Sequence, residues 1–292
     1  MRHLHGFRPK EIVLNDSMEK LNIVGGFQLP KEYRSGLGYG VNISRLMPPK
    51  HRRALKFILE KKPSLTGILG GRGCIKSSFC SFLSILRSAH GDGDTVVLSN
   101  SRYTHETFKW AIGYAKSPNW SIRHTPVKTF TYDAEELSFF KRSGTITKRI
   151  TSHVYFLPAD REQILRGFCL GKNIRHLWIE DGDQLDETTV HDFINSIPHL
   201  EDIIVTFSAG DTKFFDSNLY HYYTSGKLFR FSYEDVPTRY LGRHFFNDVN
   251  ILRNYNHDLY IREYLGLPVI KDRLYERLHR KELEILINAA KF

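Results

Sequence analysis

A glycine-rich stretch in the first third of the chain has the residue types of a phosphate-binding loop. The stretch consists of Gly70, Gly71, Arg72, Gly73, Cys74, Ile75, Lys76, Ser77 and Ser78. Glycines let consecutive backbone N–H groups point at a phosphate, and the positive end of a following helix strengthens the attraction. In such a loop Lys76 would reach the β- and γ-phosphates, and the Ser77 hydroxyl would bind Mg²⁺. These residues therefore predict a site for a nucleotide and Mg²⁺.

The loop departs from the usual motif at one position, because Ile75 stands where a glycine normally precedes the lysine. A β-branched residue is poorly suited to positive φ. We therefore expect Ile75 to have a negative, helix-like φ, with phosphate bound by the N–H groups of residues 72 to 77. On this expectation, a left-handed Ile75, or a Lys76 side chain that points away from the loop, would rule out a nucleotide site. The alternative is a glycine-rich turn that binds nothing.

Two carboxylates at the end of a later apolar segment form the second candidate motif. Glu180 and Asp181 directly follow the strand-like residues 174–179. An ATP hydrolase needs such a pair, because the first carboxylate helps to hold Mg²⁺ through water and the second polarises the attacking water. A strand that ends in two acidic residues is common among proteins. The glycine-rich loop upstream is what favours the catalytic interpretation.

Apolar runs separated by helical patterns indicate the elements that must position these residues. Strands are expected at 65–69, 95–98, 153–157, 174–179 and 202–207, helices at 50–61, after residue 76 and at 103–115, and a hairpin within 133–151. This alternation predicts an α/β fold, in which a parallel sheet has helices on both faces. Ligands of such sheets bind at the carboxyl ends of the strands. The glycine-rich loop, the acidic pair and the segment Thr206, Phe207 and Ser208 should therefore converge.

The composition of the 292-residue chain limits its partners and its surroundings. The net charge of +10 and the pI of about 9.4 favour a polyanionic partner, either nucleic acid or an anionic surface. The three cysteines lack metal-ligand spacing, which indicates a reducing cytoplasm. Because the chain has neither a membrane-length apolar run nor a signal-peptide pattern, we expect no membrane partner and no secretion.

Changes in composition along the chain suggest four parts. Residues 1–45 are expected to form an irregular N-terminal arm, residues 46–213 an ATPase core, residues 214–269 a lid subdomain and residues 270–292 a helical tail. A two-metal nuclease needs several carboxylates that converge on its ions. The tail has few acidic residues, so we expect no nuclease activity from it.

In combination, these features resemble the large subunits of tailed-phage terminases, in particular the PBSX-type branch. The resemblance covers about residues 45–269 and is carried by residues 70–79, 96–110, 154–167, 177–185, 206–208 and 260–266. The last segment reads Tyr-Ile-Arg-Glu-Tyr-Leu-Gly and is similar to the Tyr-x-x-x-x-Leu-Gly that closes the family's ATPase domain. In that branch the residue before the lysine is often not glycine, as at Ile75.

The resemblance implies a P-loop NTPase fold of the ASCE type, with a mostly parallel central sheet flanked by helices and a small C-terminal lid. It implies an ATPase, with ATP and Mg²⁺ as cofactors, that translocates double-stranded viral DNA into a procapsid. DNA would be held through its phosphates without sequence preference. The implied partners are the procapsid portal, a small terminase subunit or separate nuclease, and copies of the chain in a ring, expected to be a pentamer. The place of action would be the cytoplasm of the infected bacterium.

The resemblance also implies a role for each site residue. Lys76 and Ser77 would bind phosphate and Mg²⁺, with Glu180 as a further support of the metal. Asp181 would activate the attacking water. The segment from Thr206 through Phe207 to Ser208 would form the motif that couples hydrolysis to movement.

Two arginines complete the implied site. Arg72, within the loop, would sense the γ-phosphate. Arg166 stands where the family has an Arg-Gly, and it is the candidate for an arginine finger that completes a neighbouring subunit's site. The alternative for Arg166 is a surface residue that pairs with Asp160 or Glu162.

Three departures from the family pattern leave a second interpretation open. Asp181 stands where the family usually has a second glutamate, Ser208 stands where it usually has asparagine, and Ile75 replaces the motif glycine. These departures favour a nucleotide-binding adaptor or structural ring protein that has lost efficient hydrolysis. Because most family members continue into a nuclease domain, a fragment of a motor-nuclease is a further alternative.

Overall fold

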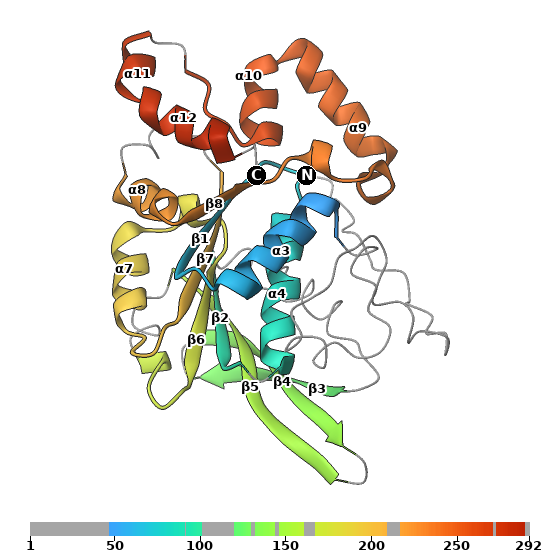
Figure 1. Cartoon of the computed structure of the whole chain (residues 1–292), viewed down its shortest axis with the longest axis vertical. Helices are drawn as coiled ribbons and strands as arrows, with labels where there is room; N and C mark the ends of the chain where they lie inside the picture. Colours follow the sequence, from blue (N-terminus) through green and yellow to red (C-terminus); the bar gives the residue numbers. More distant parts are fainter. Residues whose placement is uncertain are drawn as a thin grey trace.

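The described part of the chain is built around one sheet. The computed structural model describes residues 47–90, 92–100, 120–129, 132–143, 146–160, 167–208, 217–270 and 273–289. Within these residues an eight-stranded sheet has the strand order β3-β4-β5-β2-β6-β7-β1-β8 (Figure 1). The N-terminal arm expected at 1–45 and the helix expected at 103–115 lie outside the described residues.

The parallel part of the sheet contains every strand that the sequence predicts. It comprises β5 (Ile146–Pro158), β2 (Asp94–Ser99), β6 (Ile174–Ile179), β7 (Asp202–Phe207), β1 (Leu65–Leu69) and β8 (Lys227–Arg230). All residues of β1, β2 and β7 are buried, as in a parallel sheet covered on both faces. The predicted α/β class is therefore confirmed, and β7 separates β1 from β6.

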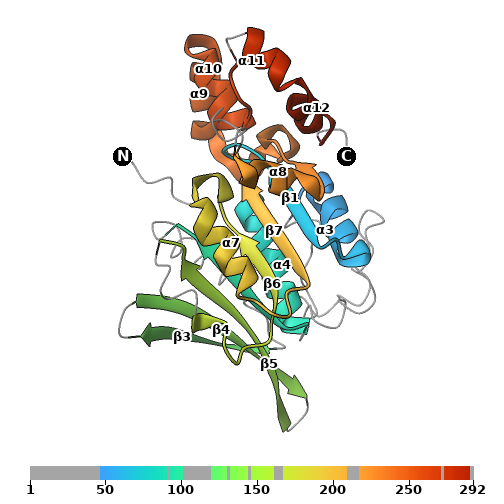
Figure 2. The same cartoon turned by 90° about the vertical axis from the view of Figure 1, so that its left-hand side faces the viewer.

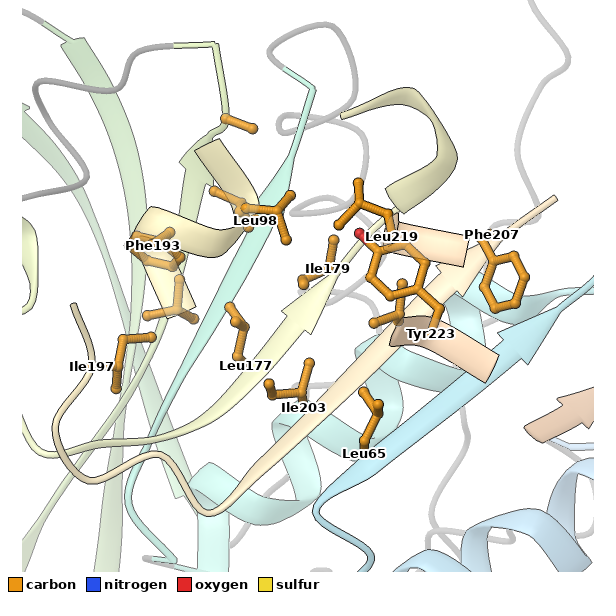
Figure 3. Packing of buried hydrophobic residues seen from close by; sticks show 14 of the residues in the cluster. Leu65, Leu98, Leu177, Ile179, Phe193, Ile197, Ile203, Phe207, Leu219 and Tyr223 are labelled. Carbon is orange, nitrogen blue, oxygen red and sulfur yellow. The ribbon is translucent and has the colours of Figure 1, made fainter. Parts of the chain in front are cut away.

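Helices cover both faces of this sheet, so each face has its own core. On one face lie α3 (Pro49–Lys61) and α4 (Lys76–His90), which bury their apolar side chains against the strands. On the other face lie α7 (Glu187–Asn195) and α8 (Asn218–Ser225) (Figure 2). Figure 3 shows this second core, in which Phe193 of α7 and Tyr223 of α8 lie over the sheet. Packing on both faces fixes the strand ends in place.

Beyond β5 the sheet continues in antiparallel order. β3 (Trp120–Thr129) pairs with β4 (Tyr132–Ser143), and β4 pairs with β5. The expected hairpin within 133–151 is therefore present as β4 and β5. β5 begins at Ile146, so it is longer than the strand expected at 153–157. In Figures 1 and 2 this hairpin extends beyond the helices that cover the parallel strands.

The C-terminal elements form a third, smaller core. They are α9 (Thr238–Tyr255), α10 (His257–Tyr260), the π-helical turn η5 (Ile261–Leu265), α11 (Arg273–Leu278) and α12 (Arg280–Ala289). Four buried residues hold α9, α10 and η5 together, and three of them are tyrosines: Tyr233, Val249, Tyr260 and Tyr264. The expected helical tail is thus present as two short helices.

The borders that the sequence suggested for the lid and the tail need correction. β8 falls within the expected lid at 214–269, yet it pairs with β1 and belongs to the central sheet. Leu286 and Ala289 of α12 are buried in the core that α7 and α8 form, so the segment expected as the tail packs on the sheet. A four-residue strand is too short to show a period in the sequence, which is why the sequence does not predict β8.

The described residues contain no helix that has both the length and the apolar character needed to cross a membrane.

Candidate functional site

The glycine-rich loop connects β1 to α4 and is tied to the neighbouring strand. The Gly70 N–H donates to the carbonyl oxygen of Phe207, the last residue of β7, at 3.1 Å. A side chain at Gly71 has no room, because a Cβ atom there would lie 2.4 Å from the Tyr264 carbonyl oxygen. Gly73 has φ +76°, a conformation that glycine adopts without steric cost. The sequence therefore folds here into a tight turn in front of a helix N-terminus.

The expectation for the backbone of Ile75 is wrong. Ile75 has φ +54°, in the left-handed region. The expectation assumed that Ile75 lies within the helix, but α4 begins at Lys76, and the Phe79 N–H donates to the Ile75 carbonyl at 3.0 Å. Ile75 is thus the residue that precedes the helix, where the dihedral angles are not helical. The strain for a side-chain-bearing residue is about 1–2 kcal/mol.

The second criterion was the direction of the Lys76 side chain, and here the structure agrees with a nucleotide site. Lys76 Nζ lies 3.3 Å from the Gly70 carbonyl oxygen, so the side chain folds back over the loop. Strained residues persist where the surrounding structure fixes them, and they concentrate at functional sites. The criterion for Ile75 is therefore too strict, because a left-handed Ile75 is compatible with a phosphate-binding loop and its positive φ alone does not exclude a nucleotide site.

A buried histidine fixes the residue before Ile75. His51 of α3 is fully buried, its Nε2 lies 2.8 Å from the Cys74 carbonyl oxygen, and its ring stacks on Phe231 at 3.8 Å. Burial lowers the pKa of His51 to about 4. The ring is therefore neutral at pH 7, and Nε2 can carry the proton that is donated to the loop.

We expect the contribution of His51 to the stability of the protein to fall when the pH drops below about 6.5, whereas the raised pKa values of Glu180 and Asp183 contribute in the opposite direction. Between the ordinary pKa of histidine and about 4, the unfolded state binds a proton at His51 that the folded state does not bind. This difference removes up to about 3 kcal/mol of unfolding free energy by pH 4. Urea unfolding at several pH values measures it. The unfolding free energy of the wild type minus that of His51→Gln, which keeps an N–H donor but does not titrate, isolates His51 and should decrease as the pH falls from 7 to 4; a difference that does not change with pH would contradict the assignment to His51.

The loop and the acidic pair are in direct contact, as the sequence predicts. Lys76 Nζ forms an ion pair with Asp181 Oδ1 at 3.0 Å. The Ser77 hydroxyl donates to Glu180 Oε1. Glu180 is 4% exposed, and it directly follows β6, whereas Lys76 and Ser77 begin α4 after β1. Residues far apart in the sequence therefore meet at the carboxyl ends of the parallel strands.

Burial and mutual charge set the protonation of this cluster. Burial, followed by the charge of Asp181, raises the pKa of Glu180, while Lys76 and the Ser77 and Thr206 hydroxyls act in the opposite direction. Burial opposes the charged form of Lys76, but the neighbouring negative charges, with Asp181 the strongest, outweigh it and raise the pKa. Lys76 is therefore a fixed cation, and it holds the Asp181 carboxylate in place.

The third predicted segment joins the same site through its side chains and backbone. The Thr206 hydroxyl donates to Glu180 Oε2 and accepts from the Asp181 N–H at 3.0 Å. Phe207 is buried, and its carbonyl oxygen accepts the hydrogen bond from the Gly70 N–H. The Ser208 N–H donates to Asp183 Oδ1 at 3.0 Å. All three segments that were expected to converge are thus connected.

Asp183 is a site residue that the sequence analysis missed. Its carboxylate accepts the hydrogen bond from the Ser208 N–H, and burial raises the pKa of Asp183 to about 6. The signal in the sequence was a third carboxylate in the run Glu180, Asp181, Gly182 and Asp183. A search restricted to the two residues directly after the strand does not detect it.

The other predicted site residues do not take part in the contacts between the glycine-rich loop and the acidic pair that are described above. Arg72 is paired with the lid: its Nε lies 3.1 Å from Glu263 Oε2, and its N–H donates to the Glu263 carbonyl at 2.7 Å. The Arg72 N–H is therefore engaged by protein, which removes it from the set expected to bind phosphate. Cys74 and Ser78 are buried beside the loop. Arg166 lies outside the described residues.

Comparisons with known proteins place this geometry in a known fold. No family model and no curated protein matches the sequence. Among solved structures, the large terminase of a thermophilic bacteriophage matches with a TM-score of 0.56 and 11% identity, over 75% of this chain and 53% of that one. The ATPase domain of the Thermus phage P74-26 large terminase matches with a TM-score of 0.52 and 12% identity, over 73% of this chain and 91% of that one.

The chain has the fold of a large-terminase ATPase domain. The resemblance stated from the sequence is thereby confirmed at the level of the fold. The chain spans about half the length of the thermophilic-bacteriophage terminase that it matches. Structures of that terminase exist in complex with ADP and with ATP-γ-S.

The residues of the site fit a nucleotide with Mg²⁺. A charged lysine at a helix N-terminus matches the chemistry of phosphate. The Ser77 hydroxyl and the Glu180 carboxylate lie side by side, and both supply oxygen ligands of the kind that Mg²⁺ prefers. The described residues contain no group of three or more His, Cys, Asp or Glu side chains that could hold a metal ion. Mg²⁺ commonly binds through one or two protein oxygens together with substrate phosphates, and this donor set is of that kind.

Proposed function

We propose that this chain is an ATP-hydrolysing motor of the terminase type, which translocates double-stranded viral DNA into a procapsid. The observation that carries the proposal is the direct contact of Lys76 and Ser77 with Asp181 and Glu180. This contact supports hydrolysis as well as binding, because it places a candidate base beside the phosphate-binding lysine. The shared fold with terminase ATPase domains supports the choice of reaction.

Each residue would act through a position that the geometry supports. Lys76 would bind the phosphates, and Ser77 with Glu180 would hold Mg²⁺, which when bound neutralises charge on the phosphate oxygens. Asp181 would accept the proton of the attacking water. In this structure Asp181 is paired with Lys76 at 3.0 Å. Phosphate that binds Lys76 would weaken this ion pair, so the base would become available only when nucleotide is bound.

The partners follow from the same proposal. A net charge of +10 supports binding of DNA through its phosphates, without sequence preference. A ring of copies on the portal of the procapsid would thread the DNA, with Arg166 of one subunit completing the site of the next. The division into ATPase core, lid and tail, with β8 assigned to the core, would then separate the hydrolytic part from the part that can move.

Steady-state ATP turnover, measured with and without double-stranded DNA, tests the proposal. A motor should hydrolyse ATP, and DNA should change the rate. The adaptor alternative is favoured by the strained Ile75 and by the short carboxylate of Asp181. Saturable nucleotide binding without turnover, in the presence of DNA as well, would establish the adaptor in place of the motor.

We expect DNA binding to be blind to sequence and strongly dependent on salt. Each phosphate contact releases counterions, so log affinity should fall linearly with log salt, with a slope of about −0.9 per contact on duplex DNA. Fluorescence anisotropy with two duplexes of equal length and unrelated sequence measures both properties. A slope near zero, or a large preference for one duplex, would assign the positive charge to another partner.

A further inference from the structure

The regular pairing of β6 with β7 ends before the acidic site begins. The last paired residues are Ile179 and Val205. The acidic turn, defined as residues 180–183, therefore extends beyond the ladder between β6 and β7, whereas Thr206 and Phe207 at the end of β7 are still paired with β1. Their relative position must be fixed by other contacts, because a loop without ladder bonds has more conformational freedom.

Side chains replace the missing ladder bonds at two points. The Thr206 hydroxyl accepts from the Asp181 N–H at 3.0 Å, at the beginning of the acidic turn. Asp183 Oδ1 accepts from the Ser208 N–H at 3.0 Å, at the end of the turn. Asp181, the proposed base, thus lies between two attachments to β7.

The middle of the acidic turn is closely packed and strained. Asp181 itself has φ +46°, in the left-handed region. A Cβ atom at Gly182 would lie 2.8 Å from both the Tyr223 ring and the Val205 side chain, so the backbone has no space to move toward α8. A strained residue keeps its conformation only while its surroundings hold it. The bond of Asp183 joins this turn to the residue that follows β7.

The other partner in this bond, Ser208, directly follows the strand that contacts the glycine-rich loop. Phe207, directly before Ser208, accepts the Gly70 N–H at 3.1 Å. The Gly70 carbonyl oxygen in turn lies 3.3 Å from Lys76 Nζ. A continuous path of hydrogen bonds and chain therefore runs from Asp183 through the end of β7 to the residue that holds the lysine.

We propose that Asp183 is a positioning residue, which sets the place of the Asp181 carboxylate relative to Lys76 through its bond to the Ser208 N–H. The inference rests on the proposed ATPase function. Asp183 would raise the rate of hydrolysis and would contribute little to nucleotide affinity, because its hydrogen bond goes to the Ser208 N–H and its charge is the weakest of those that raise the pKa of Lys76. It takes no proton from the reaction, and its role is geometric.

Single substitutions at Asp183 separate the hydrogen bond from the charge. Asp183→Ala removes the acceptor and should lower kcat by about 10- to 100-fold, as expected for the loss of a hydrogen bond to a charged group. The KM for ATP and the affinity for a fluorescent ADP analogue should change by less than about 3-fold. Asp183→Asn keeps an acceptor oxygen at the same place and should restore kcat to within about 5-fold of wild type. Asp192→Ala, an exposed aspartate on α7, is the matched control and should behave as wild type.

Ser208→Pro tests the same bond from the other side, because proline has no N–H to donate. The double variant with Asp183→Ala should be no slower than the slower single variant, as expected for two changes that break one interaction. If Asp183→Ala fails to fold, Asp183→Asn and Ser208→Pro still measure the bond. An Asp183→Ala protein with wild-type kcat, or with kcat and ADP affinity reduced in equal measure, would overturn the positioning role while leaving the ATPase function intact. A wild-type chain that binds the ADP analogue but hydrolyses no ATP would instead refute the proposed function, and this inference with it.

Discussion

Asp181→Asn is expected to bind ATP as the wild type does and to hydrolyse it about 10²–10⁴-fold more slowly, which is the usual contribution of a general base. Asparagine has nearly the same size as aspartate but cannot accept the proton of the attacking water. It also removes the 3.0 Å ion pair with Lys76, so nucleotide affinity should be unchanged or slightly higher. Single-turnover hydrolysis and equilibrium binding measure the two quantities separately.

Lys76→Ala is the informative comparison for this variant. It removes the cation that would hold the phosphates, so binding and turnover should decline together. The contrast between the two variants distinguishes a base from a binding residue. Normal turnover by Asp181→Asn would mean that another carboxylate acts as the base, and Glu180 or Asp183 would be tested next, since both lie in the same turn.

The second large effect is expected at Arg166. An arginine finger stabilises the charge that develops between the β- and γ-phosphates and contributes about 10³–10⁵ in rate. If Arg166 acts on a neighbouring subunit, Arg166→Ala and Lys76→Ala should each be inactive alone. Mixed rings of the two should regain turnover, because some sites combine an intact Lys76 with an intact Arg166 from the adjacent subunit.

The ratio in which Arg166→Ala and Lys76→Ala are mixed provides the control for this experiment. Turnover should be highest near equal amounts and absent at either extreme, and light scattering should show that the two variants assemble together. Full activity of Arg166→Ala alone would contradict the finger. The absence of recovery in mixed rings would do so as well, and Arg161, Arg149 and Arg142 would then be the next candidates.

The sequence predicts the parts of this protein in which local pattern and final environment agree. Strands buried on both faces are apolar along their length, so β1, β6 and β7 are recognisable as strands. The chemistry of the site is equally visible, because Lys76, Ser77, Glu180 and Asp181 combine residue type with position at strand ends. Parallel topology then requires that these ends meet.

The features that the sequence does not predict depend on contacts between distant segments. The positive φ of Ile75 follows from where α4 begins and from the contacts that hold Cys74 and Gly70. The place of β8 beside β1, and the bond of Arg72 to Glu263, arise when the C-terminal third of the chain packs on the sheet. No short pattern encodes such contacts, since each requires the rest of the fold.

The left-handed Ile75 has a consequence for how loops of this kind are detected and how they diverge. Glycine at this position would relieve about 1–2 kcal/mol of backbone strain, but the greater freedom of glycine in the unfolded chain would cost about 0.5–1 kcal/mol. Glycine would also lose whatever the partly buried Ile75 side chain contributes by packing. The backbone terms therefore leave a difference of at most about 1.5 kcal/mol in favour of glycine, and the packing of Ile75 reduces it. What selection must preserve here is a backbone conformation, and sequence signatures written around an obligatory glycine will overlook proteins that reach the same conformation with a larger side chain.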